Sequence, residues 1–500
     1  MRKNISRRFL LTTALASLAG GALANAPKVS LRPQLRPEGG AEAARIRSVP
    51  SVDALIERAK LGGDVGCAVV DVKTGKALEG HNAGEGMPPA SVMKAITALY
   101  ALETLGEGYR FETRLIATGP VKDGVLDGDL VLAGGGDPVL DTNGLASMAE
   151  RLKEAGISRV TGKLRAWGGA LPFTRFIDDE QPEHVGYNPS LSGLNLNFNR
   201  VHFEWKRSGG EYTVAMDARS DRYRPSVRVA RMRVANRKGP VYTYEDAGDH
   251  DAWTVASGAL GNGGSRWLPV RRPGDYAAEV FTALAQAQGV TLSAGETFDG
   301  TPDGKVLVSH LSEPLVPILQ DMLKYSNNLT AELVGMTTSA ARLGRPANLT
   351  DSGAEMSAWA QDMLGMTGAR LVDHSGLGEM SRVTPLAMAR ALARVHGEGR
   401  LKPILKPFLM RDPNGGVMEN HPVKVASKTG TLYFVSTLAG YATAPDGTEL
   451  AFAVFTHNAK LREPIDSRSD VSPPGASSWN RRAKQLQQGL IERWSVIYAG

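Results

Sequence analysis

The sequence predicts a folded protein of mixed α/β class with two or more domains. Its 500 residues exceed the length that one hydrophobic core usually supports. Short β-like runs separated by Gly-rich turns occupy residues 106 to about 305, for example DLVLAGG and VHFEWKR. Residues 320–345, 385–397 and 479–498 instead show the apolar spacing of helices. We therefore expect strands mainly in the middle of the chain and helices after it.

The overall composition is that of an ordinary globular protein. Hydrophobic residues make up 42% and charged residues 22% of the chain, which excludes a wholly disordered protein. The single cysteine, Cys67, excludes an intramolecular disulfide framework and a cysteine-based zinc cluster. Because Cys67 lies in the apolar run VGCAVV, we expect it to be a small buried hydrophobic residue.

The first 24 residues have the features of a secretory signal peptide. Four basic residues and no acid accompany a short apolar run, and Ala22-Leu23-Ala24 supplies a cleavage site. The run is too short and too interrupted for a stable membrane span. Residues 6–11 resemble a twin-arginine export motif, and a general signal with two chance arginines is an equal alternative. Either route places the mature protein outside the cytoplasm, with residues 25–49 as a linker.

The net charge of +6 belongs mostly to these N-terminal segments. The whole chain has 58 Lys and Arg against 52 Asp and Glu. Without residues 1–24 the basic count falls to 54, and without residues 25–50 it falls to 49 against 50 acidic residues. The folded part is therefore close to neutral, and its charge gives no reason to expect a nucleic-acid partner.

One S-x-x-K motif occurs in the chain, Ser91-Val92-Met93-Lys94. Two prolines precede it and the apolar segment AITALYALETLG follows, which predicts a helix that begins near the motif. A spacing of three residues puts Ser91 and Lys94 on one helical face, so the amine can reach the hydroxyl. Burial and the positive end of the helix dipole would lower the lysine pKa, which would make the amine a base for a nucleophilic serine.

An S-x-N motif, Ser326-Asn327-Asn328, lies between two segments with helical patterns. We expect a short turn there, with polar side chains directed at a site. A second S-x-N, Ser478-Trp479-Asn480, lies at the start of the C-terminal helical pattern and is interpreted as a helix N-cap.

Lys428-Thr429-Gly430 forms a K-T-G motif in a segment whose alternating pattern predicts an edge strand. A glycine in such a strand would let a ligand backbone approach closely. A second K-T-G, Lys73-Thr74-Gly75, lies between two short β-like runs and is interpreted as a plain hairpin turn.

In the order S-x-x-K, S-x-N and K-T-G, these motifs form the signature of penicillin-binding proteins and class A β-lactamases. Ser91 and Ser326 are 235 positions apart, and this long separation resembles that of the class C low-molecular-mass penicillin-binding proteins, the D-alanyl-D-alanine carboxypeptidase/endopeptidase family. The similarity runs from about Val52 to Phe455 and includes VLAGGGDPVL, SGLNLNFN, RRPGDYAAEVF and Asp373–Leu377. The chain departs from the family pattern at His374, Gly378 and Glu379, where the family more often has Gly, Ser and Arg.

The resemblance implies a catalytic domain with the α/β (α+β) fold of penicillin-binding proteins and β-lactamases, a five-stranded antiparallel sheet flanked by helices. It also implies that inserted β-rich domains interrupt this fold after the S-x-x-K helix. The expected division is a discontinuous catalytic domain of residues 50–105 and 306–500, with the inserted domains in residues 106–305.

The activity implied by the resemblance is that of a periplasmic serine D-Ala-D-Ala carboxypeptidase, with D,D-endopeptidase activity also expected. Such an enzyme hydrolyses D-Ala-terminated peptidoglycan stem peptides through an acyl-enzyme, and β-lactams acylate it. The implied catalytic residues are Ser91 as nucleophile, Lys94 as its proton acceptor, Ser326 as proton relay to the leaving amine, Asn328 as a ligand of the peptide backbone, and Lys428 as a positive charge that polarises Ser326. The implied substrate-binding residues are Thr429 for the terminal carboxylate, Gly430, and Thr431, whose N–H would form an oxyanion hole with that of Ser91.

No metal or cofactor is expected, because none of the nine histidines lies in an H-E-x-x-H or comparable pair. The expected partners are stem peptides, with β-lactams as inhibitors, and any membrane association is expected to be peripheral. The sequence does not give the oligomeric state, although the resemblance allows a homodimer. It also does not give the balance of exopeptidase and endopeptidase activity.

Two alternatives to this function stay open from the sequence. A β-lactamase would carry the same motifs, although the long insertion argues against it. A non-catalytic penicillin-binding or wall-binding protein would use the inserted domains as its surface, although all five polar catalytic side chains are present. A serine triad at Asp373-His374-Ser375 is disfavoured, because adjacent residues of one turn cannot adopt triad geometry.

Overall fold

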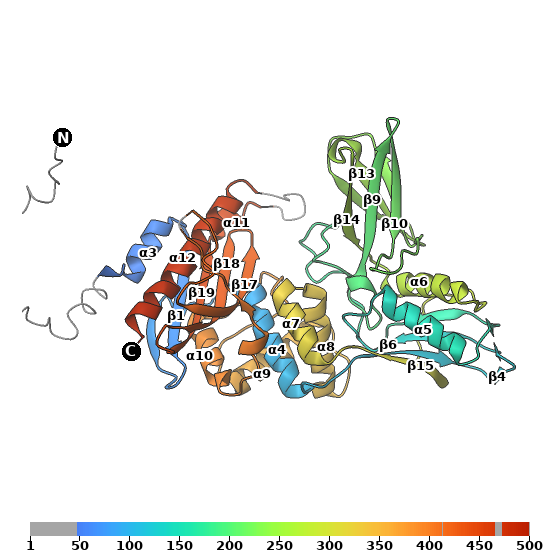
Figure 1. Cartoon of the computed structure of the whole chain (residues 1–500), viewed down its shortest axis with the longest axis horizontal. Coiled ribbons are helices and arrows are strands. Elements are labelled where there is room, and N and C mark those ends of the chain that lie inside the picture. The colour runs from blue at the N-terminus through green and yellow to red at the C-terminus, as the bar shows by residue number, and fades with distance from the viewer. Residues whose placement is uncertain (1–47, 413, 466–472, 500) are drawn as a thin grey trace, which may run out of the picture. The chain divides into compact units, whose positions relative to one another are not determined.

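A six-stranded antiparallel sheet lies at the centre of the part of the chain that carries the three motifs (Figure 1). Its order is β16 (Lys406–Pro407), β17 (Lys424–Leu432), β18 (Val435–Thr443), β19 (Glu449–His457), β1 (Asp64–Asp71) and β2 (Ala77–His81). Five strands were expected. The sixth is the two-residue β16, which pairs only with Ala426 and Ser427 at the edge of β17.

The computed structural model describes residues 48–412, 414–465 and 473–499. The predicted signal peptide, residues 1–24, lies outside the described residues, as do all but the last two residues of the predicted linker 25–49.

Both faces of the six-stranded sheet are covered by helices, because residues of its central strands are apolar on both sides. Leu450, Phe452 and Val454 of β19 pack with α3 (Val52–Ala59) and α12 (Ala476–Ile497). The alternate residues Ala451 and Phe455 pack on the other face. That face is covered by α4 (Lys94–Thr104), α7 (Leu315–Tyr325), α8 (Asn328–Leu343), α9 (Leu349–Leu364) and α10 (Pro385–His396). The period-two alternation of a strand thus divides its residues between two hydrophobic clusters.

The predicted helices of this region are present. The pattern over 320–345 corresponds to the end of α7 and to α8, that over 385–397 to α10, and that over 479–498 to α12. The expectation that Ser478 is a helix N-cap is wrong. Helix α12 begins at Ala476 after Gly475, and the Ser478 hydroxyl donates to the Gly475 carbonyl within the first turn.

The segment between α4 and α7 forms four further sheets and two α-helices. Its strands are β3 (Glu112–Ala117), β4 (Val121–Lys122), β5 (Val125–Leu126), β6 (Leu130–Gly134), β7 (Arg159–Val160), β8 (Leu164–Trp167), β9 (Arg200–Ser208), β10 (Glu211–Asp217), β11 (Ala230–Ala235), β12 (Tyr242–Asp246), β13 (Asp251–Ala256), β14 (Gly263–Pro269) and β15 (Lys305–Leu311). The sheet orders are β15-β3-β6-β8, β4-β5-β7, β10-β9-β14 and β11-β13-β12. The strand β15, which starts at residue 305, pairs with β3 of this segment.

Two helices in this segment were not predicted, α5 (Thr142–Glu154) and α6 (Pro273–Ala287). Their apolar residues, among them Leu145, Met148, Tyr276 and Phe281, share one hydrophobic cluster with the surrounding strands. This cluster is separate from the two clusters on the six-stranded sheet. The middle of the chain therefore has its own core.

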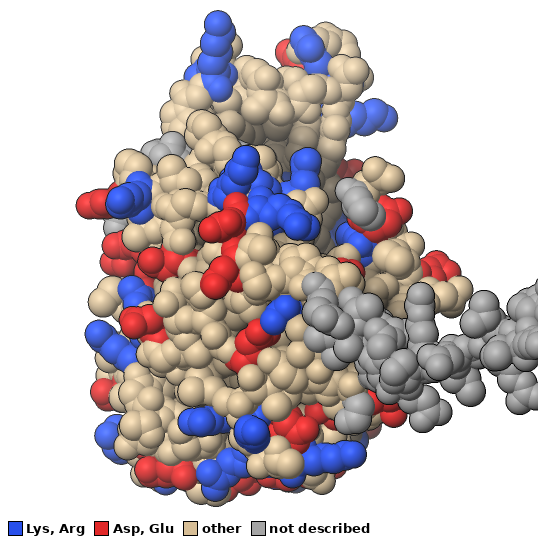
Figure 2. Space-filling model, turned by 90° about the vertical axis from the view of Figure 1, so that its left-hand side faces the viewer, with Lys and Arg blue, Asp and Glu red and all other residues tan. Residues whose placement is uncertain are grey.

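The surface and the single thiol agree with the sequence analysis. Basic and acidic side chains are interspersed over the face shown in Figure 2. Among the described residues, no helix combines the length and the apolar character that crossing a membrane requires. Cys67 is fully buried, and burial raises the pKa of its thiol to about 12.

Candidate active site

Ser91 lies in a single turn of 3₁₀ helix, Ala90–Met93, that leads directly into α4. The residue before it, Ala90, has a left-handed backbone with φ of 45°. Such a conformation is unfavourable for a residue with a side chain and persists only where the surroundings fix it. Here the Thr437 hydroxyl donates to the Pro89 carbonyl at 2.8 Å, which ties the segment before Ser91 to strand β18.

The amine of Lys94 is fully buried and has three oxygen neighbours. Its Nζ lies 3.0 Å from Ser91 Oγ, 2.7 Å from Asn328 Oδ1 and 2.8 Å from the Ser375 carbonyl. The amide and carbonyl oxygens can only accept hydrogen bonds, so they hold two amine protons. In the neutral amine the lone pair is then left for the Ser91 hydroxyl. This arrangement brings together the first motif and one residue of the second, and it suits proton transfer from Ser91.

The protonation of Lys94 is set by opposing effects. Burial lowers the pKa of its amine and the negative charges of Glu332 and Asp373 raise it, which together give a pKa of about 8. A pKa near 8 makes the neutral amine available near neutral pH, which a general base requires.

The S-x-N motif forms the expected turn between α7 and α8. Ser326 ends α7 in a left-handed conformation with φ of 58°, and Asn327 caps α8 by accepting a hydrogen bond from the Thr330 N–H at 3.0 Å. Asn328 is the first residue of α8. Its side-chain oxygen faces Lys94 and its Nδ2 donates to the Tyr187 carbonyl at 2.9 Å. One asparagine thus connects Lys94 to the segment between β8 and β9.

Lys428 lies in β17 beside the second serine. Its Nζ is 2.9 Å from Ser326 Oγ and 2.7 Å from the Thr429 carbonyl. Burial, together with the nearby positive charges of Lys94 and Lys406, lowers the pKa of Lys428 to about 6. The free site therefore favours a neutral Lys428 at pH 7, whereas the sequence analysis expected a positive charge there.

The K-T-G strand has an open edge next to Ser91. The Phe408 N–H donates to the Val425 carbonyl. The backbone N–H and C=O groups of Val425, and of every second residue after it, therefore point to the edge of β17 where β16 pairs. Among the described residues, β16 pairs no farther than Ser427. The N–H and C=O groups of Thr429 and Thr431 therefore face an unpaired edge, and both side chains are exposed.

Gly430 allows a close approach of two segments of the protein itself. A Cβ at this position would collide with the Thr437 side chain and would lie 2.9 Å from the Ser91 nitrogen. The glycine thus lets the protein's own Ser91 segment approach the strand. The expected approach of a ligand backbone at this strand stays a prediction.

Two buried carboxylates that the sequence analysis missed hold the loop behind Lys94. Glu332 accepts the N–H groups of His374 and Ser375 at 2.9 Å each. Asp373 accepts those of Gly376 and Gly378 at 2.7 and 2.6 Å. Burial raises the pKa of both carboxyls, while these hydrogen bonds lower it. Glu332 has no motif signal, whereas Asp373 belongs to a segment already noted for its family resemblance.

His374 is part of the packing and not of a triad. Its ring is fully buried, its Nε2 lies 2.7 Å from Ser352 Oγ and its ring is parallel to that of Tyr100. Burial lowers the pKa of His374 to about 3, which keeps the ring neutral. The residue that departs from the family pattern at this position therefore packs in the core around α8 and α9.

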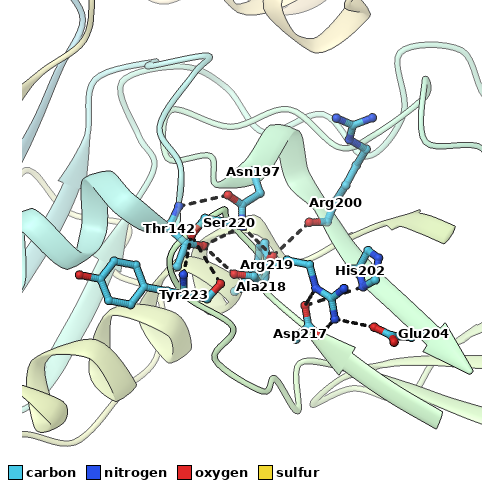
Figure 3. Close-up of polar contacts among 11 residues, drawn as sticks. Thr142, Asn197, Arg200, His202, Glu204, Asp217, Ala218, Arg219, Ser220 and Tyr223 are labelled. Atoms are coloured by element: carbon cyan, nitrogen blue, oxygen red, sulfur yellow. Dashed lines mark hydrogen bonds and ion pairs between the residues drawn. The ribbon is translucent and has the colours of Figure 1, made fainter. Parts of the chain in front are cut away.

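Two other sequence features lie away from this site. Lys73-Thr74-Gly75 forms the predicted hairpin turn, in which the Thr74 N–H donates to Asp71 Oδ1 at 2.7 Å. The described residues contain one group of three potential metal ligands, which consists of His202, Glu204 and Asp217. Arg219 bridges its carboxylates, at 2.6 Å from Glu204 and 3.0 Å from Asp217 (Figure 3). The guanidinium supplies the positive charge there, so the group is an ion-pair network.

Comparison with known proteins gives consistent matches. The model of the D-Ala-D-Ala carboxypeptidase 3 (S13) family matches residues 49–472. The chain is 30% identical to the D-alanyl-D-alanine carboxypeptidase of Actinomadura sp. (strain R39), over 87% of this chain and 85% of that one. It is 25% identical to the D-alanyl-D-alanine carboxypeptidase DacB of Haemophilus influenzae, over 85% of this chain and 91% of that one.

Solved structures show the same fold. The crystal structure of penicillin binding protein 4 (dacB) from Haemophilus influenzae superposes with a TM-score of 0.73 at 22% identity, over 89% of this chain and 100% of that one. The complex of that protein with a novel beta-lactam superposes with a TM-score of 0.69 at 21% identity, over 88% of this chain and 99% of that one.

Proposed function

The chain belongs to the D-Ala-D-Ala carboxypeptidase 3 (S13) family, and we propose that Ser91 is the nucleophile of a serine D-Ala-D-Ala carboxypeptidase that hydrolyses peptidoglycan stem peptides. The observation that carries this proposal is the arrangement around Lys94, whose two carbonyl-type acceptors leave the amine lone pair to Ser91 Oγ. β-lactams would acylate the same serine. The related penicillin binding protein 4 has been solved complexed with a beta-lactam.

Acylation begins with transfer of the Ser91 proton to Lys94. The serine oxygen then attacks the carbonyl carbon of the penultimate D-Ala. The N–H groups of Ser91 and Thr431 would stabilise the oxyanion, because the Thr431 N–H faces the open edge of β17 next to Ser91.

Departure of the terminal D-Ala requires a proton on its amine. Ser326 would deliver it, since its hydroxyl is 2.9 Å from Lys428 Nζ and can be reprotonated from that amine. Thr429, exposed at the same edge, would bind the terminal carboxylate. A bound carboxylate favours the charged form of Lys428, so the positive charge there would develop when an anionic substrate is present. Water then hydrolyses the acyl-enzyme.

The location and domain organisation are also proposals. We infer that residues 1–24 direct export to the periplasm, where stem peptides occur, and that residues 25–49 link them to the folded chain. The separate core of the middle segment supports the division into a discontinuous catalytic domain and inserted domains. D,D-endopeptidase activity would use the same Ser91 centre on a cross-linked substrate.

The direct test is incubation of the mature protein with purified muropeptides, with mass spectrometry of the products. We expect loss of one alanine from pentapeptide stems and a persistent covalent penicillin adduct, both abolished by Ser91→Ala. Unchanged cleavage by Ser91→Ala would refute the nucleophile. Rapid turnover of penicillin would indicate a β-lactamase, and the absence of any cleavage by wild type would favour a binding protein.

A matched pair of variants tests the second motif. Ser326→Ala should slow D-Ala release at least about a hundredfold, because the leaving amine loses its proton donor. Ser478→Ala changes the first serine of the other S-x-N, which lies in the first turn of α12, and should leave the rate unchanged.

A further inference from the structure

A cavity of about 650 Å³ borders the S-x-N turn of the proposed active site. One wall comes from α7 and from Ser326, Asn327 and Asn328, and the other comes from residues 186–200 of the middle segment. Its lining is largely apolar, from side chains that include Tyr187, Phe198, Ile318 and Met322. A cavity that adjoins the proposed proton donor Ser326 lies where a leaving group would depart.

Arg200 is the one cationic residue in the lining of this cavity. Among the described residues, its side chain makes no hydrogen bond or ion pair, and its Nε is buried without a partner. The guanidinium instead lies over two aromatic rings, 5.2 Å from the centre of Phe198 and 5.8 Å from that of Trp267. Arg200 is half-buried, and this burial lowers the pKa of its guanidinium. A partly desolvated cation without a counter-ion is costly, so this residue calls for an anionic partner.

The backbone around Arg200 is fixed by a strained turn. Asn197, Phe198 and Asn199 all have left-handed conformations, with φ of 52°, 57° and 50°. Side-chain hydrogen bonds hold the turn, from Asn197 to Thr142 at 2.9 Å and from Asn199 to the Ser190 carbonyl at 2.8 Å. Strain of this kind is typical of functional positions.

The side chain of Arg200 is directed away from the neighbouring ion pairs. Tyr276 donates to its backbone carbonyl at 3.0 Å, and its guanidinium points away from the network of Asp217, Arg219 and Glu204 (Figure 3). Gly186 makes room for it, because a Cβ there would lie 3.2 Å from Arg200 Cδ. The cation is therefore held beside the cavity and is not paired with the carboxylates of Asp217 and Glu204.

The two reactions open to this centre differ in the charge of their leaving group. A carboxypeptidase releases alanine, whose single carboxylate has its proposed place at Thr429. An endopeptidase releases a whole stem peptide, which carries at least one further carboxylate. An arginine binds a carboxylate through two parallel hydrogen bonds, and a lysine does so less specifically.

We propose that Arg200 binds a second carboxylate on the leaving stem peptide of a cross-linked substrate, and that the cavity between the S-x-N turn and residues 186–200 receives this peptide. The proposal rests on the proposed function of the Ser91 centre. Asp321, the exposed acid of the same lining, lies on α7 and suits the N–H or ammonium groups of such a peptide. The apolar side chains between them suit its aliphatic parts.

The test compares three substrates with purified wild type, Arg200→Ala and Arg200→Lys. The substrates are a pentapeptide monomer, a cross-linked muropeptide dimer, and the same dimer in which only the further carboxylates of the leaving stem are amidated. The carboxylate next to the scissile amine, which has its proposed place at Thr429, stays free in all three. For each protein, kcat/KM for the dimer is divided by kcat/KM for the monomer. In wild type, this ratio should be about tenfold lower for the amidated dimer than for the unmodified one. Arg200→Ala should lower the same ratio about tenfold through KM, and amidation should have no further effect on it. Arg200→Lys should recover part of the loss.

Arg207→Ala is the matched control. Arg207 lies on the same strand β9 and over an aromatic ring, at 5.7 Å from the centre of Tyr212, but it is exposed and outside the cavity. Its variant should keep the wild-type ratio. Thermal unfolding of all variants separates a loss of folding from a loss of binding.

Each outcome decides between the hypotheses. Equal losses on monomer and dimer in Arg200→Ala, equal cleavage of both dimers by wild type, or no cleavage of the dimer at all would each overturn the role of Arg200. Failure of wild type to release D-Ala from the monomer would instead refute the proposed function itself.

Discussion

The backbone carbonyl of Ser375 accepts a hydrogen bond from the amine of Lys94 at 2.8 Å, although the two residues are 281 positions apart. The contact fixes one of the amine protons, and Asn328 fixes a second. The direction of the lone pair toward Ser91 therefore depends on the position of the loop 373–378. Gly376 brings this loop against Ala90, because with φ of 76° its Cβ would collide with the Ala90 backbone. Ser91 and the loop behind Lys94 are thus positioned together.

The rate of acylation should rise with pH through about 8. Only the neutral amine of Lys94 can accept the Ser91 proton, and burial lowers the pKa of this amine to about 8. The fraction in the active form therefore increases as pH increases, with a slope of one proton. The second-order rate constant for β-lactam acylation, measured from pH 5 to 10, checks this. Lys73→Ala, in the hairpin K-T-G, should reproduce the wild-type profile, and a rate that falls between pH 7 and 9 would contradict the assignment.

Glu332→Gln should reduce both activity and stability and shift the pH profile. The negative charge of Glu332 raises the pKa of Lys94, so its removal should move the rising limb to lower pH. The new amide NH₂ cannot accept a hydrogen bond, so the N–H of His374 or Ser375 loses its partner at a cost of about 1–3 kcal/mol. Urea unfolding and the acylation profile measure the two effects. Glu57→Gln, an exposed position on α3, is the control, and an unshifted limb would argue against a charged Glu332 near the base.

Gly430→Ala should abolish acylation, whereas Gly75→Ala should not. A methyl group at position 430 meets the Thr437 side chain and the Ser91 nitrogen, so it displaces the nucleophile from the strand. At position 75 nothing lies within 4 Å, and the cost there is the positive φ of 69°, about 1 kcal/mol. Labelling with a fluorescent penicillin compares the two variants of the same tripeptide. Normal labelling of Gly430→Ala would contradict the packing argument.

The parts of the site that short-range patterns encode could be predicted from the sequence. The reach from Lys94 to Ser91 follows from a spacing of three residues on one helix. The S-x-N turn follows from two helical patterns that meet at Ser326, and the K-T-G strand follows from alternation. These features need only local geometry.

What the sequence could not show depends on contacts between distant segments. Nothing local marks Glu332, an acid within an apolar helix, as the acceptor for a loop forty residues later in the chain. The lowered pKa of Lys428 comes mainly from its burial and from the charge of Lys94 nearby. Only the fold brings these two lysines together. Helix α6 is different, because its apolar residues Tyr276, Val280 and Leu284 have helical spacing that could have predicted it.

His374→Ala should destabilise the fold by about 3 kcal/mol near pH 7, because it removes a buried ring and leaves a cavity. The loss should depend on pH. The pKa of His374 is about 3 in the folded chain and near 6.5 when the chain unfolds, so between these values the unfolded chain binds one more proton. Wild-type stability therefore contains a contribution that is fully present above about pH 6.5. It is lost as pH falls toward 3, by up to about 1.4 kcal/mol per pH unit.

The alanine variant lacks this group, so the difference in unfolding free energy between wild type and variant should shrink below about pH 6.5. Urea unfolding of both proteins at pH 7.0, 6.0 and 5.0 measures that difference and cancels the other titrating groups, such as Asp373 and Glu332, that both share. A difference that stays constant over this range, or that grows as pH falls, would mean that the ring is protonated in the folded state. In that case the pairing of its Nε2 with Ser352 would have to be that of an imidazolium donor.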